Sequence, residues 1–215
     1  MHRMSNAEIM MIVLTAVLAA TSVITVLIFN SQLGVMQTQV QDSRDALIVA
    51  NRASVFLNRY DVSPVADKDG KIVGWEINPI FENAGNTPTK SMVIRINAQL
   101  TPEDPPADEF PPDRPETVDL QGSMIRPHGT LTAAGAVVSV EHIDEIVAKK
   151  QKFFIWGWVE YRDTFKGTPC HRTRFFNSLS IVADYRKPKA TDGALPLRMP
   201  IVGKFNDPDD LCSHT

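Results

Sequence analysis

An uncharged apolar segment near the N-terminus restricts the fold more than any other feature of this sequence. From Ile9 to Phe29 the chain runs for 21 residues without a charged side chain. As a helix with a rise of about 1.5 Å per residue, the segment is about 30 Å long, which matches the hydrocarbon thickness of a bilayer. The sequence therefore predicts a transmembrane helix within residues 1–30. Its lipid-facing anchor includes Ile9, Leu14, Leu18, Val23, Leu27 and Phe29.

A cleaved signal peptide is the alternative interpretation of this segment. Such peptides have an apolar region of about 7 to 15 residues that ends at a cleavage site of the Ala-x-Ala type. Val17-Leu18-Ala19 can be assigned that role only with difficulty, because apolar sequence continues for ten more residues. We therefore expect an uncleaved anchor.

The charges that flank the segment predict its orientation. His2 and Arg3 precede it, whereas the first positive residue after it is Arg44. Positive residues are retained on the cytoplasmic side, so the N-terminus is expected in the cytoplasm and the rest of the chain outside it. That compartment would permit a disulfide between Cys170 and Cys212.

Composition excludes one class of partner and bounds the size of the core. The 215 residues are 43% hydrophobic, which suffices for one folded domain of ordinary size. A formal net charge of -3 gives no basic surface for phosphate backbones, so no nucleic-acid partner is expected. Two cysteines provide neither a disulfide framework nor a Cys-x-x-Cys motif.

A heptad-like stripe follows the span, and predicts an amphipathic juxtamembrane helix over residues 31–52 that continues the span to about Ala50. Two interpretations remain open. The stripe packs on the protein's own domain, or it mediates association with a second copy or another membrane protein. Ala16 and Ala20 favour association, because small residues four apart let two spans approach closely. The interaction candidates are Leu33, Met36, Val40 and Leu47.

From Ala53 the hydrophobic period changes from helical to two residues, as in half-buried strands. Turn residues at Asp67–Gly70 and Glu82–Pro88 separate the strands, and a short helix is expected over His142–Lys150. Six or seven short strands joined by turns favour an immunoglobulin-like antiparallel β-sandwich over a barrel. The predicted fold is therefore mainly β, with the sandwich in residues 53–185.

Two segments lack this periodicity. Residues 101–116 contain six prolines and six acidic residues, which cannot donate a hydrogen-bond ladder, so an exposed, extended loop is expected. A proline-rich docking segment is the alternative, although no basic residue flanks a P-x-x-P core there. Residues 186–215 are expected to form an extended tail that lies along the surface or is mobile.

The stretch from Trp156 to Phe176 (WGWVEYRDTFKGTPCHRTRFF) predicts a β-hairpin, with Asp163–Pro169 as its connection. Alternation places Phe154, Trp156, Trp158 and Glu160 on one face of the first strand, and Ile155, Val159 and Tyr161 on the other. We expect the aromatic rings to anchor the sandwich core. On the returning strand, His171, Thr173 and Phe175 alternate with Arg172 and Arg174.

Asp163 and His171 bracket this connection and are expected to face one another, with Tyr161 and Arg174 nearby. Such a pair supplies the groups for acid/base chemistry, and a hydrolase is one alternative function. The favoured interpretation is structural, because polar clusters between strands commonly fix their register.

A metal site is the second alternative, and would make the chain a metal or redox accessory protein. Its ligands would be Cys170, His171, Cys212 and His214. Zinc ligand pairs are normally two to four residues apart, whereas Cys170 and His171 are adjacent. No phosphate loop, nucleophile elbow or His-Glu-x-x-His motif occurs, so neither a cofactor nor catalysis is expected.

Three stretches carry a resemblance: ALIVANRA (46–53), NAGNTPT (83–89) and the Trp158–Phe175 hairpin. With the N-terminal span, they resemble a widespread group of uncharacterised, single-span membrane proteins of proteobacteria. The Asn-x-Gly-x-Thr-Pro element also looks like the B–C turn of immunoglobulin-like modules in envelope proteins. The likeness covers most of Ile9–Ala183, without the acidic loop, and implies a single-pass protein of the bacterial inner membrane with a periplasmic domain.

These observations predict a membrane-anchored periplasmic binding or scaffolding protein. We expect it to be an accessory or structural subunit of a membrane complex, and not an enzyme. Its expected partners are the lipid bilayer and another membrane protein or a second copy of itself.

Overall fold

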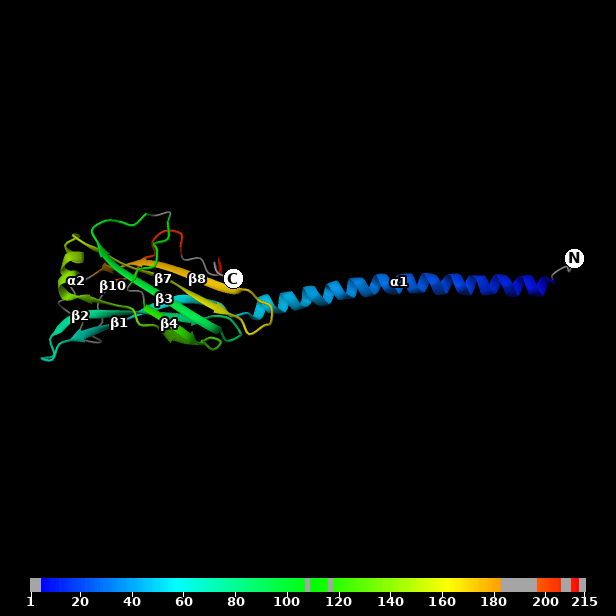
Figure 1. The fold of residues 1–215 in the computed structure, drawn as a ribbon, viewed down its shortest axis with the longest axis horizontal. Coiled ribbons are helices and arrows are strands. Elements are labelled where there is room, and N and C mark those ends of the chain that lie inside the picture. The colour runs from blue at the N-terminus through cyan, green and yellow to red at the C-terminus, as the bar shows by residue number, and fades with distance from the viewer. Residues whose placement is uncertain (1–4, 107–108, 116–117, 183–196, 206–209, 213–215) are drawn as a thin grey trace. The chain divides into compact units, whose positions relative to one another are not determined.

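The computed structural model describes residues 5–106, 109–115, 118–182, 197–205 and 210–212. Contacts divide the chain into two compact units, residues 1–50 and 51–215. Figure 1 labels the helices and strands along the chain.

The first unit consists of one α-helix, α1 (Asn6–Asn51), which contains the uncharged segment. Its start is capped by Ser5 and Glu8, since the Ser5 N–H donates to Glu8 Oε2 at 2.8 Å and the Glu8 N–H donates to Ser5 Oγ at 3.4 Å. The hydroxyl groups of Thr15, Ser22 and Thr25 each donate to a carbonyl oxygen one turn earlier, at 2.8 Å. Such internal hydrogen bonds satisfy polar groups where water is absent.

Among the described residues, α1 is the one helix that is long and apolar enough to cross a membrane. It has 46 residues and buries none of them. At about 1.5 Å per residue it is more than twice as long as a hydrocarbon layer of about 30 Å is thick. The predicted continuation of the helix to about Ala50 is confirmed, so the candidate span and the juxtamembrane segment share one helix.

The second unit contains a four-stranded antiparallel sheet. β2 pairs with β1 along one edge. Along its other edge β2 pairs with β6 near its N-terminal end and with β5 near its C-terminal end. The strands are β1 (Val55–Ala66), β2 (Ile72–Asn83), β5 (Thr130–Thr132) and β6 (Ala136–Ser139). The predicted Asp67–Gly70 turn joins β1 to β2, with Gly70 at a φ of 76°. Pro79 of β2 has no N–H to donate. The pairing along this edge of β2 is interrupted there, between the residues that pair with β6 and those that pair with β5.

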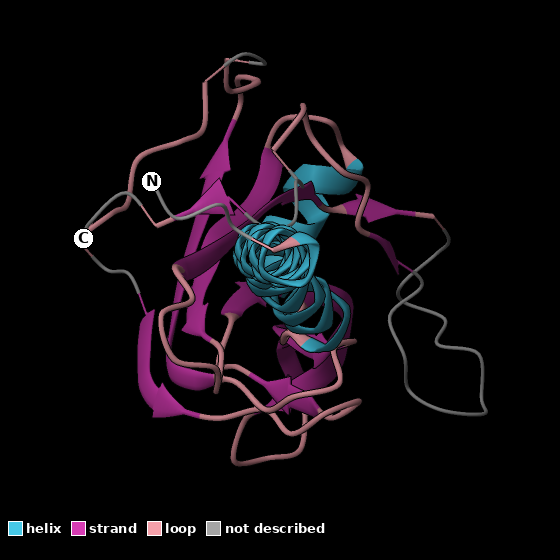
Figure 2. Ribbon diagram, turned by 90° about the vertical axis from the view of Figure 1, so that its right-hand side faces the viewer, coloured by secondary structure: helices cyan, strands magenta, loops and turns pink. Residues whose placement is uncertain are grey.

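The other large sheet has five strands in the order β11-β8-β7-β3-β4. They are β3 (Lys90–Thr101), β4 (Val118–Ser123), β7 (Lys152–Arg162), β8 (Cys170–Ser178) and β11 (Asp210–Leu211). A two-stranded ribbon joins β9 (Ser180–Ile181) to β10 (Leu197–Arg198). The short helix α2 (Val140–Val147) begins at Ser139, whose Oγ accepts from the His142 N–H, and it buries Ile143 completely. Figure 2 distinguishes the strands from the loops that connect them.

Asn83 holds the turn between β2 and β3, where the chain passes from one sheet to the other. Its Oδ1 accepts from the N–H groups of Ser54 and Gly85, both at 3.0 Å, and its Nδ2 donates to the Thr87 carbonyl oxygen at 2.7 Å. A Cβ on Gly85 would lie 2.1 Å from the Arg52 carbonyl oxygen, so only glycine fits. The NAGNTPT element therefore has a structural role in the described fold.

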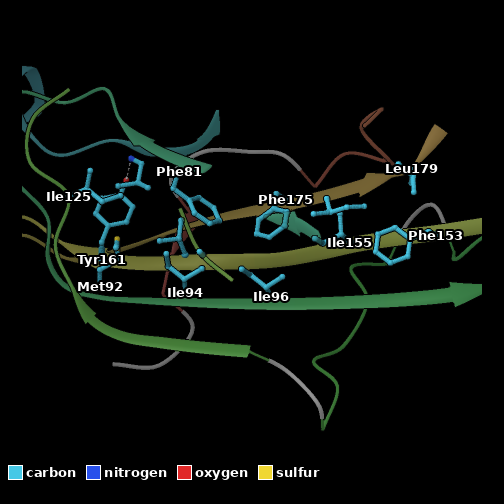
Figure 3. Close-up of a cluster of buried hydrophobic side chains, with 14 of the residues drawn as sticks. Phe81, Met92, Ile94, Ile96, Ile125, Phe153, Ile155, Tyr161, Phe175 and Leu179 are labelled. Carbon is cyan, nitrogen blue, oxygen red and sulfur yellow. Dashed lines mark hydrogen bonds between the residues drawn. The ribbon is translucent and has the colours of Figure 1, made fainter. Parts of the chain in front are cut away.

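One hydrophobic core joins the two large sheets. Phe81 of β2 and Phe175 of β8 pack edge to face with their ring centroids 5.6 Å apart, and Ile94 and Ile155 lie in the same cluster (Figure 3). Edge-to-face packing adds to the free energy of burying both rings. The prediction of a mainly β chain with antiparallel sheets and an N-terminal apolar helix is confirmed.

We call the face of the five-stranded sheet that contributes to this core its inner face, and the opposite face its outer face. The predicted alternation along β7 is confirmed, and the expectation that rings of this stretch anchor the core holds for Tyr161 and Phe175 but is wrong for Phe154 and Trp156. Ile155, Val159 and Tyr161 enter the shared core, whereas Phe154 and Trp156 belong to a second cluster on the outer face. Its members are Phe154, Trp156 and Phe176, packed against Phe110, Val202 and Phe205.

Two segments, the acidic proline loop and part of the C-terminal tail, cover this second cluster. Phe110 comes from the acidic proline segment, most of whose described residues are exposed as expected, but which packs on the outer face through this ring. Val202 and Phe205 come from the tail, where the Val202 N–H donates to the Phe176 carbonyl oxygen at 2.8 Å. Sequence periodicity cannot detect either contact because both are formed with strands distant in the chain. The parts of the tail at 186–196, 206–209 and 213–215 lie outside the described residues.

Candidate binding site on the outer sheet face

The acidic proline segment is held at its C-terminal end by Asp113. Asp113 Oδ2 accepts from Arg95 Nη1 at 3.0 Å and from Trp158 Nε1 at 3.4 Å, and its Oδ1 accepts from Asn97 Nδ2 at 3.0 Å. Asn97 Oδ1 accepts in turn from the Arg114 N–H at 2.8 Å. Side chains of β3 and β7 thus fix this part of the loop by charge-assisted hydrogen bonds.

Further contacts attach the rest of the loop. Asp104 forms an ion pair with Lys152 at the start of β7, and Thr101 Oγ1 accepts from the Glu103 N–H at 3.3 Å. The Pro112 carbonyl oxygen accepts from Trp156 Nε1 at 3.3 Å. The loop is therefore attached to the sheet at several points along its length.

A cavity of about 340 Å³ lies between this loop and the sheet. Its floor consists of Phe154, Trp156 and Phe176, which are at most 4% exposed. The volume falls within the range of about 300–1,000 Å³ typical of ligand sites, and an apolar floor with a few polar groups is their usual composition. The other residues that line it are Gln99, Thr101, Glu103, Asp104, Pro105, Pro106, Glu109, Pro111 and Pro112.

The lining carries unneutralised negative charge. Four acidic side chains of the loop are described, and two of them, Asp104 and Asp113, are ion-paired with Lys152 and Arg95. Glu103 and Glu109 both line the cavity and form no ion pair with any described residue. The polar lining is thus dominated by carboxylates.

A stacked set of side chains lies on the outer face of β3, β7 and β8, apart from the residues that line the cavity. The guanidinium groups of Arg95 and Arg172 lie over the Trp158 ring, at 5.2 Å and 4.8 Å from its centroid. Arg172 is also ion-paired with Glu160. These cation–π contacts hold Trp158 in place beside Asp113.

The predicted proximity of Asp163 and His171 is confirmed. Asp163 Oδ2 lies 3.1 Å from His171 Nε2, and the Tyr161 and His171 rings stack with centroids 5.5 Å apart. Arg174, which was expected nearby, instead lies on the outer face with its guanidinium 5.6 Å from the Phe110 ring centroid.

This polar cluster connects β1 to the β7–β8 hairpin. Asp163 Oδ1 accepts from the Ala53 N–H at 2.7 Å, the Tyr161 hydroxyl accepts from the Val55 N–H at 3.2 Å, and Thr173 Oγ1 donates to the Val55 carbonyl oxygen at 2.6 Å. Asp163 and His171 are only 4% and 3% exposed. Neither residue lines the cavity under the acidic proline loop, and Asp163 also accepts from the main chain before β1, so the arrangement favours a structural role.

The candidate metal ligands are arranged in a way that disfavours a metal. Cys170 and Cys212 form a disulfide with a Cα–Cα distance of 5.4 Å. The Glu160 carboxylate lies close to both sulfur atoms, but a metal binds thiolates, and the sulfurs are joined to each other. His171 faces Asp163 in the interior, and His214 lies outside the described residues.

A second cavity, of about 550 Å³, lies between strand β8 and the edge of β1 that pairs with no described strand. Leu57, Phe175, Leu197 and Met199 give it apolar walls. The Tyr60 hydroxyl donates to Asn177 Oδ1 at 3.0 Å, and burial raises the pKa of Tyr60 well above its usual value. Because the Tyr60 hydroxyl and the Asn177 side chain are hydrogen-bonded to each other, they give this groove little means of selecting a ligand.

The predicted anchor and interaction residues all lie exposed on α1. Exposed fractions run from 48% for Ile9 to 63% for Leu27 in the predicted anchor, and from 49% for Leu33 to 69% for Val40 in the stripe. An apolar helix whose side chains are this exposed requires lipid or a partner protein to cover it.

Sequence reasoning missed the cavity on the outer face. The one signal available was Phe110, a large apolar residue within an otherwise acidic and proline-rich segment. Comparison with protein-family models, curated proteins and solved structures finds no match. The function of this chain must therefore be inferred from the geometry of the site itself.

Proposed function

We propose that this chain is a membrane-anchored binding protein without catalysis of its own, which serves as an accessory or scaffolding subunit of a membrane complex. The observation that carries the proposal is the cavity beneath the acidic proline loop, with its floor of Phe154, Trp156 and Phe176. A loop attached to a rigid sheet over an aromatic floor presents a preformed site. The long apolar helix α1 would keep that site near the membrane.

The proposal includes the location of the two units. The N-terminus would be cytoplasmic, and the β domain would lie in the periplasm of a bacterium with α1 in its inner membrane. Arg3 before the apolar segment and Arg44 as the first cation after it support this orientation. The Cys170–Cys212 disulfide supports it independently, because such bonds persist in oxidising compartments.

We also propose that the domain is an immunoglobulin-like sandwich, and that the chain is related to the single-span proteobacterial proteins it resembles. Two antiparallel sheets over one core support the sandwich. The Asn83 turn, at the point where the chain changes sheet, supports the likeness to the B–C turn.

The binding function is testable in native membranes. A photo-crosslinking residue replaces Pro106, which is exposed and lines the cavity, and a control carries the same residue at Asp69 in the β1–β2 turn. Position 106 should give one adduct of reproducible mass, and position 69 should not. The proposal fails if neither position gives an adduct, or if both give the same adducts.

Self-association is a separate part of the proposal. Leu33, Val40 and Leu47 are seven residues apart, which places them in one row of a heptad repeat on the exposed helix. Replacing Val40 and Leu47 with Asp should convert an oligomer into a monomer in maltoside micelles, measured by light scattering. The paired control replaces Gln37 and Arg44, which lie outside the stripe, with Ala. An unchanged mass in the Asp variant would exclude this row as the contact.

A further inference from the structure

We propose that the cavity on the outer face accepts a cationic side chain, a lysine ammonium or an arginine guanidinium, from a partner protein. This inference rests on the proposed binding function and adds the chemistry of the group that is bound. Three properties of the lining support it: its hydrogen-bonding groups, its charge and its floor.

The lining offers mainly hydrogen-bond acceptors. Four of its residues are prolines, which have no main-chain N–H: Pro105, Pro106, Pro111 and Pro112. The carboxylates of Glu103 and Glu109 accept only, and the Thr101 hydroxyl oxygen already accepts from the Glu103 N–H. Among the described lining side chains, N–H groups occur on the Gln99 amide and on Trp156, whose Nε1 donates to the Pro112 carbonyl oxygen, and Thr101 carries one O–H. Such a lining complements a ligand with several donors.

The charge of the lining selects a cation. Lys152 neutralises Asp104, while Glu103 and Glu109 remain without a described counter-ion. An anion brought into the cavity would approach two like charges, whereas an ammonium or guanidinium group would neutralise them. Complementary charge contributes to both the rate and the specificity of association.

The aromatic floor matches the remainder of such a side chain. The faces of Trp and Phe rings carry negative electrostatic potential that attracts cations, and the methylene stem of Lys or Arg packs on apolar surface. Phe154 and Trp156 reach the base of the cavity with 4% and 3% of their surface exposed, and Phe176 packs on both rings without exposed surface of its own. Neighbouring side chains on the same sheet face already show this interaction, since Arg95 and Arg172 stack on Trp158.

The shape of the site favours a side chain that projects from a protein over a free small molecule. Glu103, Asp104, Pro106 and Glu109 are exposed, so the cavity is open to solvent along the loop. An open cavity encloses only part of a ligand, and leaves room for the chain from which the side chain projects.

The test uses the full-length protein in maltoside micelles, which carry no choline headgroup to compete. The probes are end-blocked pentapeptides, Gly-Gly-Arg-Gly-Gly and Gly-Gly-Lys-Gly-Gly, with citrulline or norleucine at the centre of the neutral controls. The readout is the indole N–H resonance of Trp156, assigned with Trp156→Phe. The cationic peptides should shift this resonance saturably and bind at least tenfold more tightly than the neutral ones, with the difference shrinking as salt is added.

The test variant, E103Q/E109Q, removes two carboxylate charges from the cavity. The matched control, D69N/E141Q, removes two carboxylate charges from exposed sites elsewhere. The first should weaken binding of the arginine peptide at least tenfold, and the second should leave it unchanged. Equal binding of the citrulline peptide, or no effect of E103Q/E109Q, would overturn the inference. Spermidine or choline binding more tightly than either cationic peptide would overturn the assignment to a protein partner.

These outcomes are distinguishable from failure of the proposed function. An adduct at position 106 that persists in E103Q/E109Q leaves the binding function standing and removes the cation inference. Absence of any adduct in the otherwise unaltered protein removes the binding function.

Discussion

The two faces of the five-stranded sheet both bury aromatic side chains, but different structures cover them. The inner face packs against another sheet, with Phe81 on Phe175 and a hydrogen-bonded cluster around Asp163. The outer face is covered by a loop and a tail segment, attached through ion pairs and a few hydrogen bonds. A cover of loops is less constrained than a sheet, and such segments commonly carry binding function.

This difference suggests a division of roles between the faces. Substitutions on the inner face should chiefly change the free energy of unfolding, and those on the outer face should chiefly change binding. Four measurements test the division.

The largest effect is expected in the shared core. Phe175→Ala removes a ring that is 1% exposed and packs on Phe81, which should lower the free energy of unfolding by about 3–5 kcal/mol. Urea denaturation followed by tryptophan fluorescence measures the change. Phe110→Ala is the outer-face counterpart, and an equally large loss there would contradict the comparison.

The disulfide should come next. Cys170 and Cys212 are 42 residues apart, and closing a loop of that length stabilises a fold by about 2–4 kcal/mol. Cys170→Ser/Cys212→Ser should lower the urea midpoint accordingly, and reduction of the unaltered protein should reproduce the shift. Stoichiometric zinc bound by the reduced protein would instead favour the metal alternative.

Asp163→Ala should have an intermediate effect. It leaves the buried Ala53 N–H without its acceptor and removes the group that faces His171, at a cost of about 1–3 kcal/mol. The position-106 adduct should still form in this variant below its unfolding midpoint. Loss of the adduct with unchanged stability would contradict a purely structural role.

The smallest change in stability is expected for Asp113→Ala. Its side chain and that of Arg95 are each about one-third exposed, and such pairs contribute roughly 1 kcal/mol or less. The variant should still weaken binding of the arginine peptide, because Asp113 attaches the loop that forms the cavity. Unchanged binding of the arginine peptide would show that the remaining contacts suffice to hold the loop.

Local patterns predicted the elements well. The two-residue alternation identified β2, β3, β7 and β8, and the Asp67–Gly70 turn followed from residues that tolerate a left-handed backbone. The proximity of Asp163 and His171 was also predictable, since both flank one hairpin connection. The short strand β4 was missed, because six residues after a proline-rich segment give too little periodicity.

The cavity was not predictable in the same way. Alternation showed that Phe154, Trp156 and Trp158 share a face, but not which of the two faces meets the other sheet. That choice depends on the total apolar area buried by all strands together. The residues that cover the outer face come from 101–116 and from the tail, and are separated from β7 and β8 by long stretches of chain.

The sequence by itself determined the apolar helix, the antiparallel strands and the turns, because each arises from the spacing of neighbouring residues. Only the tertiary structure decided that an acidic proline loop covers an aromatic surface, and that Cys170 meets Cys212. Those features depend on contacts between distant segments, whose free energies are shared among many residues and leave no period in the sequence.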